Sequence, residues 1–232
     1  MVRHRLALFI LLLTAAPASA AERRYTVTDF DKIQVDGPYQ VALATGHASS
    51  ARASGSPAAL DALTVAVEGR TLRIRRDSSA WGADWNRGSG QVALTVTTQD
   101  LRTAFVNGAG SLTIDKAQGL KMEASVAGSG ELVITSVDTD TLAVNLLGSG
   151  KLGISGKTKS LRAEIHGSGS LDGAALASKD AQVFADTAGT IRVGASRSAN
   201  IVSSASGEVE IVGNPSCTVK VTGTGSVRCG RN

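Results

Sequence analysis

The chain has 232 residues, and its 24 Lys and Arg against 20 Asp and Glu give a net charge of +4 at pH 7. This mild excess of positive charge argues against a nucleic-acid-binding role, because such domains usually carry a strongly basic patch. Aromatic residues make up only 3% of the chain. Any core must therefore be aliphatic and narrow.

The N-terminal residues predict export from the cytoplasm. Two arginines, Arg3 and Arg5, precede an apolar run over residues 6–13, and Ala18-Ser19-Ala20 follows. These are the three parts of a secretory signal peptide, with cleavage expected after Ala20. The run is far shorter than the ~20 residues of a membrane span, and the mature chain contains no other candidate span. We expect a signal peptide over residues 1–20 and a mature chain in the periplasm, outside the cell or on its surface.

Residues 21–100 predict an irregular N-terminal region built of strands. Apolar and polar residues alternate there, and Asp36-Gly37-Pro38 and Glu68-Gly69 are typical of turns. The pattern predicts strands over residues 30–35, 39–43, 63–67, 71–74 and 92–96, and the third and fourth of these form a hairpin. We interpret the region as first coils and a cap, because an open solenoid end would expose unpaired strand edges.

A loop in this region holds the only two tryptophans of the chain. Trp81 and Trp85 lie with Asp84, Asn86 and Arg87 between two predicted strands. Aromatic rings beside polar side chains could stack on sugar rings, which makes these five residues a candidate binding site. In the alternative interpretation, the tryptophans form an apolar lid over the open end of the core.

Residues 101–232 contain seven copies of a repeat that turns on small residues. The second glycine of each copy stands at 110, 130, 150, 169, 189, 207 and 225, a spacing of 18 to 20 residues that indicates a solenoid. Sharp corners require either positive φ or a residue without Cβ. The candidate corner glycines are Gly108, Gly110, Gly128, Gly130, Gly148, Gly150, Gly167, Gly169, Gly189, Gly207, Gly223 and Gly225.

Apolar residues recur at fixed places on both sides of each corner. Leu132 and Ile134, for example, have equivalents in the neighbouring copies at 112, 114, 152 and 154. This period-2 alternation predicts strands whose inward positions stack from copy to copy. A coil of strands and turns fits a single-stranded parallel β-helix. The alternative at this period, a leucine-rich repeat, requires an Asn or Cys frame that is missing.

The two cysteines, Cys217 and Cys229, lie in the last copy at positions that are apolar in the other copies. An oxidising compartment permits a disulfide between them. Two separate buried thiols remain the alternative. A metal site is disfavoured because no His or acidic cluster accompanies the pair.

Two further groups of polar residues are candidate sites. His166 has Glu164, Asp172 and Asp186 nearby in sequence, but Glu164 and Asp172 occupy different repeat positions, which indicates a solvated face rather than a polysaccharide-cleaving site. Asp138-Thr139-Asp140 resembles part of a calcium loop without the remaining ligands. We therefore expect no catalytic residues, no metal and no cofactor.

Three segments together resemble the head GIN domain family, whose members carry the label of autotransporter adhesins. They are F-D-K-I-Q-V-D-G-P-Y-Q-V-A-L at residues 30–43, T-L-R-I at 71–74 and the repeated V-x-G-S-G-x-L-x-I. The resemblance covers residues 25–229 and implies a secreted right-handed β-helix, with no catalytic motif to transfer. The altered corners at 188–189 and 206–207 depart from the pattern and predict less regular coils there.

These observations favour a non-enzymatic protein of the cell envelope that binds or adheres. A glycan or a cell-surface protein is the expected partner class, and nucleic acid is not. The alternatives are a carbohydrate-active β-helix enzyme, such as a polysaccharide lyase or hydrolase, and a purely structural envelope protein. The sequence leaves the choice between monomer and homo-oligomer open.

Overall fold

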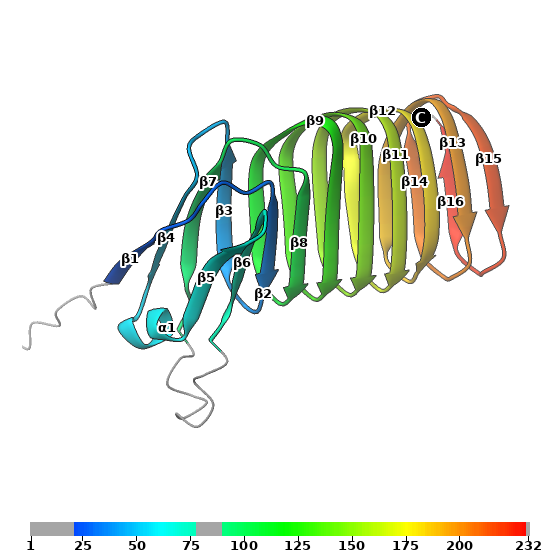
Figure 1. The fold of residues 1–232 in the computed structure, drawn as a ribbon. Coiled ribbons are helices and arrows are strands. Elements are labelled where there is room, and N and C mark those ends of the chain that lie inside the picture. Colours follow the sequence, from blue (N-terminus) through cyan, green and yellow to red (C-terminus); the bar gives the residue numbers. More distant parts are fainter. Residues whose placement is uncertain (1–20, 78–89, 231–232) are drawn as a thin grey trace, which may run out of the picture.

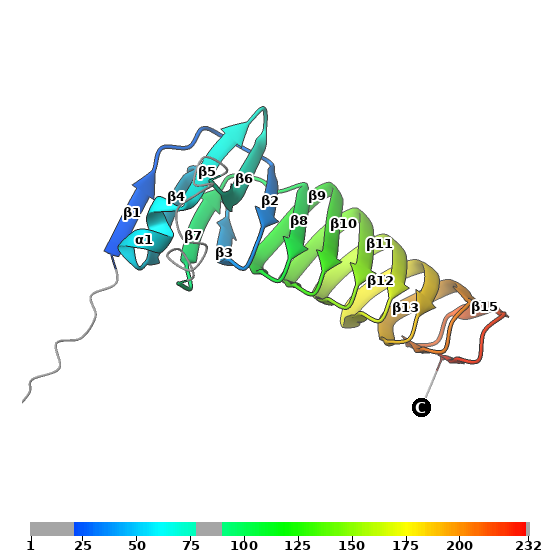
Figure 2. The ribbon, with the colours of Figure 1, turned by 90° about the horizontal axis from the view of Figure 1, so that it is seen from below.

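The computed structural model describes residues 21–77 and 90–230, and these residues form a stack of β-coils with an irregular N-terminal end (Figures 1 and 2). Each long strand supplies most of one coil and pairs in parallel with the strand of the next coil. These strands are β9 (Ser111–Gly128), β10 (Glu131–Gly148), β11 (Lys151–Gly167), β12 (Ser170–Thr187) and β13 (Thr190–Ser203). The predicted parallel β-helix is confirmed.

The register of the coils stacks the apolar positions that the sequence predicts. Leu132 lies between Leu112 and Leu152, and its exposed fraction is 0%. Ile134 lies in the same way between the isoleucines of the two adjacent coils. Burying one such side chain fully stabilises the fold by about 1.5–3 kcal/mol. A continuous aliphatic core therefore runs along the axis of the solenoid.

The two glycines of each corner serve different purposes. The first glycines of four corners, Gly108, Gly128, Gly148 and Gly167, have φ between +99° and +113°, where side chains other than glycine are strained. The second glycine has no such φ. At Gly130 a Cβ would lie 2.6 Å from the carbonyl oxygen of Gly110 in the preceding coil. Positive φ thus explains the first glycine of these pairs, and close approach of two backbones explains the second.

The first of the altered corners keeps its shape through a side chain. Thr187 stands where the earlier copies have a glycine, and it is buried. Its Oγ1 donates to the carbonyl of Gly169 at 3.1 Å and accepts from the amide of Gly189 at 2.9 Å. The next strand, β14 (Glu208–Val212), still pairs in parallel with β13. The expected irregularity does not interrupt the stack.

The N-terminal strands extend two faces of the solenoid. β2 (Lys32–Asp36) pairs in parallel with β8 (Thr103–Gly108), and β3 (Gln40–Thr45) pairs in parallel with β9. The predicted hairpin is formed by β5 (Leu63–Glu68) and β6 (Thr71–Arg76), which pairs with β2, while β7 (Ala93–Thr98) pairs with β3. These pairings place the irregular strands on the first coil as a strand-rich cap.

Three elements of this end were not predicted. β1 (Ala21–Tyr25) and β4 (Ser50–Gly55) form an antiparallel pair at the edge, and α1 (Pro57–Asp61) follows β4. Ser56 caps α1 by accepting from the amide of Ala59, and Pro57 lies in its first turn. Ser followed by Pro is a helix-start signal, and α1 is short enough to escape a search for helical periodicity.

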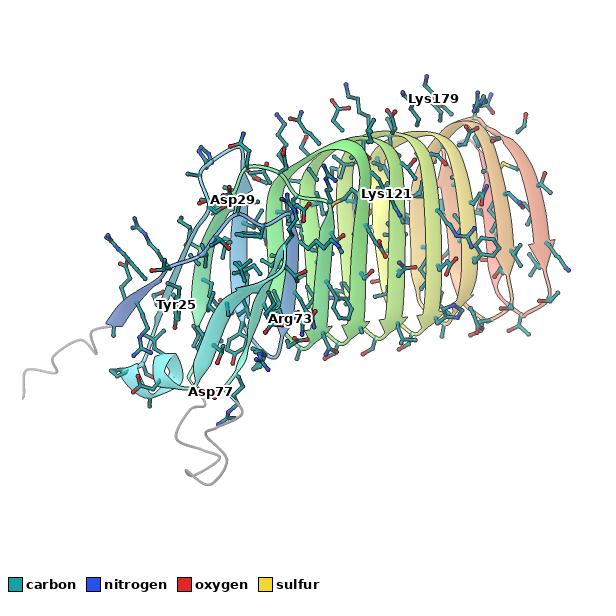
Figure 3. All side chains as sticks on the ribbon, in the orientation of Figure 1. Tyr25, Asp29, Arg73, Asp77, Lys121 and Lys179 are labelled. Atoms are coloured by element: carbon teal, nitrogen blue, oxygen red, sulfur yellow. A yellow bond between two sulfur atoms is a disulfide. The ribbon has the colours of Figure 1, made fainter. Side chains whose placement is uncertain are left out.

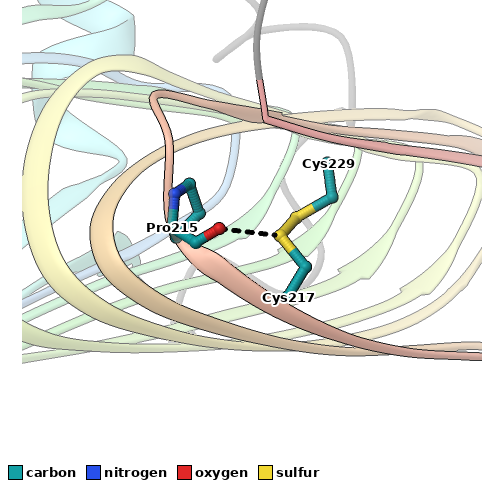
Figure 4. The surroundings of a disulfide bond; sticks show 3 residues. All are labelled: Pro215, Cys217 and Cys229. Carbon is teal, nitrogen blue, oxygen red and sulfur yellow. Dashed lines mark hydrogen bonds between the residues drawn. A yellow bond between two sulfur atoms is a disulfide. The ribbon is translucent and has the colours of Figure 1, made fainter.

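The last coil consists of β15 (Ser216–Val221) and β16 (Ser226–Cys229), joined by a disulfide between Cys217 and Cys229 (Figure 4). The two Cα atoms are 6.4 Å apart. Cys217 is in register with Ala199 and Cys229 with Ile211, both of which are buried. The predicted disulfide is present and lies across the interior columns, although Cys217 itself is exposed at the end of the stack.

Candidate functional site

The interior of the solenoid is filled with side chains, so a ligand would bind on the outer surface. The inward columns of the stacked coils carry side chains that are buried almost completely. No helix among the described residues is long and apolar enough to cross a membrane. The candidate sites are therefore the grooves and faces on the outside of the coils.

One groove runs beside the stacked glycine corners, along the edge where the strands in Figure 1 end in arrowheads. Its volume is about 530 Å³, and residues from four successive turns line it. They are Pro38, Tyr39, Gln40, Gln91, Ala109, Gly110, Ser111, Ser129, Gly130, Glu131, Ser149 and Lys151. The exposed corner residues in this lining, Ala109, Ser129 and Ser149, are small, and the two serines carry hydroxyl groups.

The polar wall of the groove is a row with one side chain from each coil. Gln40 pairs with Ser111, Ser111 with Glu131, and Glu131 with Lys151 in the parallel ladder. Neighbouring members of such a row are roughly 4.8 Å apart, the spacing of adjacent strands. Gln40, Glu131 and Lys151 are exposed. The row thus offers an amide, a hydroxyl, a carboxylate and an ammonium group at a regular spacing.

Tyr39 adds a buried phenol at the N-terminal end of the groove. Its ring packs against Gly37, where a Cβ would approach the ring to 3.1 Å. Burial raises the pKa of Tyr39 above its ordinary value of 10.0, and the positive charge of Arg76 opposes this shift. The phenol therefore stays neutral at physiological pH.

The tryptophan loop that the sequence predicts as a binding site, Trp81, Asp84, Trp85, Asn86 and Arg87, lies outside the described residues. The described chain resumes at Gly90, and Gln91 lines the groove.

The residues around His166 do not form one catalytic cluster. Asp172 lies on β12 in register with Arg192, on a different face from Glu164 and His166. His166 Nδ1 is 3.6 Å from Asp186 Oδ2 in the next coil. His166 and Asp186 are both exposed, as expected for the solvated face that the sequence predicts here.

Charged side chains on that face interact with one another, and Arg162 is an example. Its guanidinium binds Glu164 at 2.5 Å and lies 4.8 Å from the centre of the Phe184 ring. The stacking of Arg162 on Phe184 was not predicted. The repeat could have revealed it, because the coil offset places Phe184 beside Glu164.

Asp138 and Asp140 are likewise engaged. Asp138 pairs with Lys157 at 3.2 Å, and Asp140 pairs with Lys159 at 2.8 Å. Within residues 21–77 and 90–230, no three His, Cys, Asp or Glu side chains gather in a way that could hold a metal ion. The two aspartates form ion pairs between coils, not a calcium loop.

Solved structures with the same fold are known. A putative adhesin from Bacteroides fragilis NCTC 9343 is 19% identical, with a TM-score of 0.82 over 92% of this chain and 98% of that one. A structure described as a putative lipid binding protein, from Parabacteroides distasonis ATCC 8503, is 20% identical, with a TM-score of 0.71 over 93% and 98%. A putative adhesin from Parabacteroides merdae ATCC 43184 has a TM-score of 0.67 at 14% identity over 93% and 98%. At these identities the likeness concerns the fold alone.

A search of curated proteins found no match. The family model described as "Putative auto-transporter adhesin, head GIN domain" matches residues 29–215, which is most of the chain. This span runs from β2 to β14 and leaves out β1 and the last coil. The chain therefore belongs to the head GIN domain family.

Proposed function

We propose that this protein is exported to the cell envelope and acts there as a non-catalytic binding or adhesive module. The family and its structural neighbours carry adhesin names, which supports a binding role. The expected signal peptide over residues 1–20 supports export. The ligand class we favour is an extended polar polymer, either a glycan or a segment of a cell-surface protein.

The observation that carries this proposal is the row of Gln40, Ser111, Glu131 and Lys151 beside the glycine corners. Solenoids present long surfaces of this kind, built from equivalent positions of successive repeats. An extended polymer can follow the groove and meet one donor or acceptor per coil. Trp81 and Trp85, which the sequence offers as candidates for stacking on sugar rings, would suit a glycan ligand.

One structural neighbour carries a lipid-binding name, but the described residues give less support for a lipid ligand. Small apolar ligands usually occupy concave, mostly apolar sites. The inward columns of the described coils are filled with their own side chains. The groove along the corners has polar side chains on its wall.

The experiment is a binding screen with the mature chain, first on a glycan array and then on whole bacterial cells. The test variant combines Glu131→Ala with Lys151→Ala. The control is Lys179→Ala, an exposed lysine at the edge opposite the corners (Figure 3). We expect the double variant to lose at least about tenfold in affinity, about 1.4 kcal/mol, while the control binds like the parent chain.

Three results would contradict the proposal. One is equal binding by the double variant and the parent chain, which would place the ligand elsewhere on the surface. Another is robust turnover of a polyuronide or another glycan, which would favour the enzyme alternative. The third is absence of binding to every glycan and every cell type, which would favour a structural role.

A further inference from the structure

The C-terminal end of the solenoid leaves apolar residues uncovered. Val219 and Val221 lie in the inward columns of β15, in register with Ile201 and Ser203 of β13, both of which are buried. The two valines are nevertheless 44% and 42% exposed. The reason is geometric, because β15 pairs with β13 on one side and with no other described strand.

The backbone of β15 is also unpaired along this side. In a parallel ladder the N–H and C=O groups of one residue point to one neighbouring strand, and those of the next residue point to the other. Thr222 donates its N–H to Ser203 of the preceding coil. By this alternation, Cys217, Val219 and Val221 direct their backbone groups toward the open end.

The two ends of the molecule are protected to different degrees. At the N-terminal end the edge strand β1 carries Glu22, Arg23 and Arg24, and charged edge strands resist pairing with other chains. At the C-terminal end β15 carries a single charge, Lys220. The disulfide between Cys217 and Cys229 holds the last coil closed, so its edge is fixed in advance of any contact.

We propose that this end pairs with the same end of a second copy of the chain, β15 against β15 in antiparallel orientation about a two-fold axis at Val219. In this register Val219 faces its own counterpart, and Cys217 faces Val221. Inward columns then continue from one copy into the other. The single charge of β15, Lys220, faces Thr218, so the β15–β15 ladder contains no pair of like charges.

The neighbouring registers are less favourable. Centring the axis on Lys220 places two ammonium groups opposite one another, which destabilises a strand pair. Centring it on Thr218 brings Pro215 into the pairing, and proline has no N–H to donate. An axis at Val219 therefore avoids facing like charges and keeps Pro215 out of the β15 pairing.

The proposed interface is small, so we expect a low affinity between the two copies. The end of one coil offers far less than the ~800 Å² per partner of a standard interface. We expect a dissociation constant on the order of 100 µM, as in weak and transient complexes. Association should therefore be visible in concentrated solution or where the protein is confined to a surface.

Introducing a charge at the two-fold axis tests the proposal. Val219→Lys and Val219→Glu each place like charges opposite one another in a self-pair, whereas an equimolar mixture of the two variants places opposite charges there. Sedimentation of the mature chain should show dimers that weaken at least about tenfold in each variant alone and recover in the mixture. Val212→Lys is the matched control, because Val212 is 37% exposed on β14 and not on β15.

Recovery in the mixture also shows that the variants fold. Should neither variant fold, hydrogen exchange on the parent chain provides an independent readout. The amides of Cys217, Val219 and Val221 should gain protection as the protein concentration rises. A parent chain that remains monomeric at millimolar concentration, a mixture without recovery, or amides whose exchange ignores concentration would each overturn the proposal.

Discussion

Replacing Gly130 with alanine tests the packing of the corners directly. The added Cβ would lie 2.6 Å from the carbonyl oxygen of Gly110 and 2.8 Å from Val106 Cγ1, whereas ordinary van der Waals contact begins at 3.4 Å. The same Gly110 oxygen accepts the amide of Glu131 at 2.9 Å. A methyl group that displaces this oxygen therefore also strains a hydrogen bond between coils.

The expected cost combines these two effects. Overpacking in a tight contact costs about 1–3 kcal/mol, and a weakened hydrogen bond adds up to about 1 kcal/mol. For a domain of this size each kcal/mol lowers the melting temperature by roughly 2–4 °C. A total of about 1–4 kcal/mol means that Gly130→Ala should melt roughly 2–16 °C below the parent chain.

The control is Gly153→Ala on β11, where the nearest atom to an added Cβ is Val133 Cγ2 at an ordinary 3.7 Å. Alanine within a strand restricts the unfolded chain more than glycine does, so this variant should be neutral or slightly stabilising. Thermal melts followed by circular dichroism compare the two. Equal melting temperatures for the Gly130 and Gly153 variants would refute close approach as the reason for the second glycine.

Three further predictions concern the core, the disulfide and one acid. Leu132→Asp should destabilise the fold by several kcal/mol, because it buries an unpaired charge between Leu112 and Leu152. Ser129→Ala on the exposed corner should change the melting temperature little, and similar melting temperatures for the two variants would disprove the register. Replacing both cysteines by alanine should destabilise the last coil by up to ~3 kcal/mol in the chain-entropy model, and free thiols on alkylation of the parent chain would contradict the bond. Arg197 and Ser198 hold the pKa of Asp180 down to about 2 from 3.8. The hydrogen bonds of the Asp180 carboxylate therefore stabilise the fold fully above pH 3.8, and this stabilisation is lost as the pH falls through about 2. Arg197→Ala should move the Asp180 titration, followed by NMR, back toward 3.8, and an unchanged titration would show that Arg197 does not control it.

The regular part of this fold could be predicted because each coil repeats the same physical constraints. Leu132 and Ile134 recur in neighbouring copies, and a repeat of fixed period leaves few registers that bury them all. The cysteine pair followed from the same reasoning, since Cys217 and Cys229 occupy inward columns. Even the altered corner at Thr187 keeps the register, because a threonine hydroxyl provides hydrogen bonds where the earlier copies have glycine.

The N-terminal end and the groove were harder to predict because they depend on contacts without a repeat. β4 reads S-A-R-A-S-G, in which small alanines occupy the buried positions, so hydrophobicity alone gives a weak strand signal. The four residues Gln40, Ser111, Glu131 and Lys151 have no chemical property in common, so the sequence alone does not group them. They become a row only when β3 is known to pair with β9, which joins residues about 70 positions apart.

The two proposals concern opposite parts of the solenoid, and this separation has a consequence for adhesion. The groove lies between Pro38 and Lys151 near the N-terminal end, whereas the proposed joint uses β15 in the last coil. A tail-to-tail pair would therefore leave both grooves free. Because antiparallel pairing of β15 reverses the strand direction, the corner edges of the two copies, and with them the two grooves, would lie on opposite edges of the pair. Such a pair cannot easily place both grooves on one surface, which avidity requires, but it can bridge two ligand-bearing particles. If both proposals hold, Val219→Lys should leave the affinity for a soluble ligand unchanged and weaken the bridging of ligand-coated particles, whereas the Glu131 and Lys151 variant should weaken both.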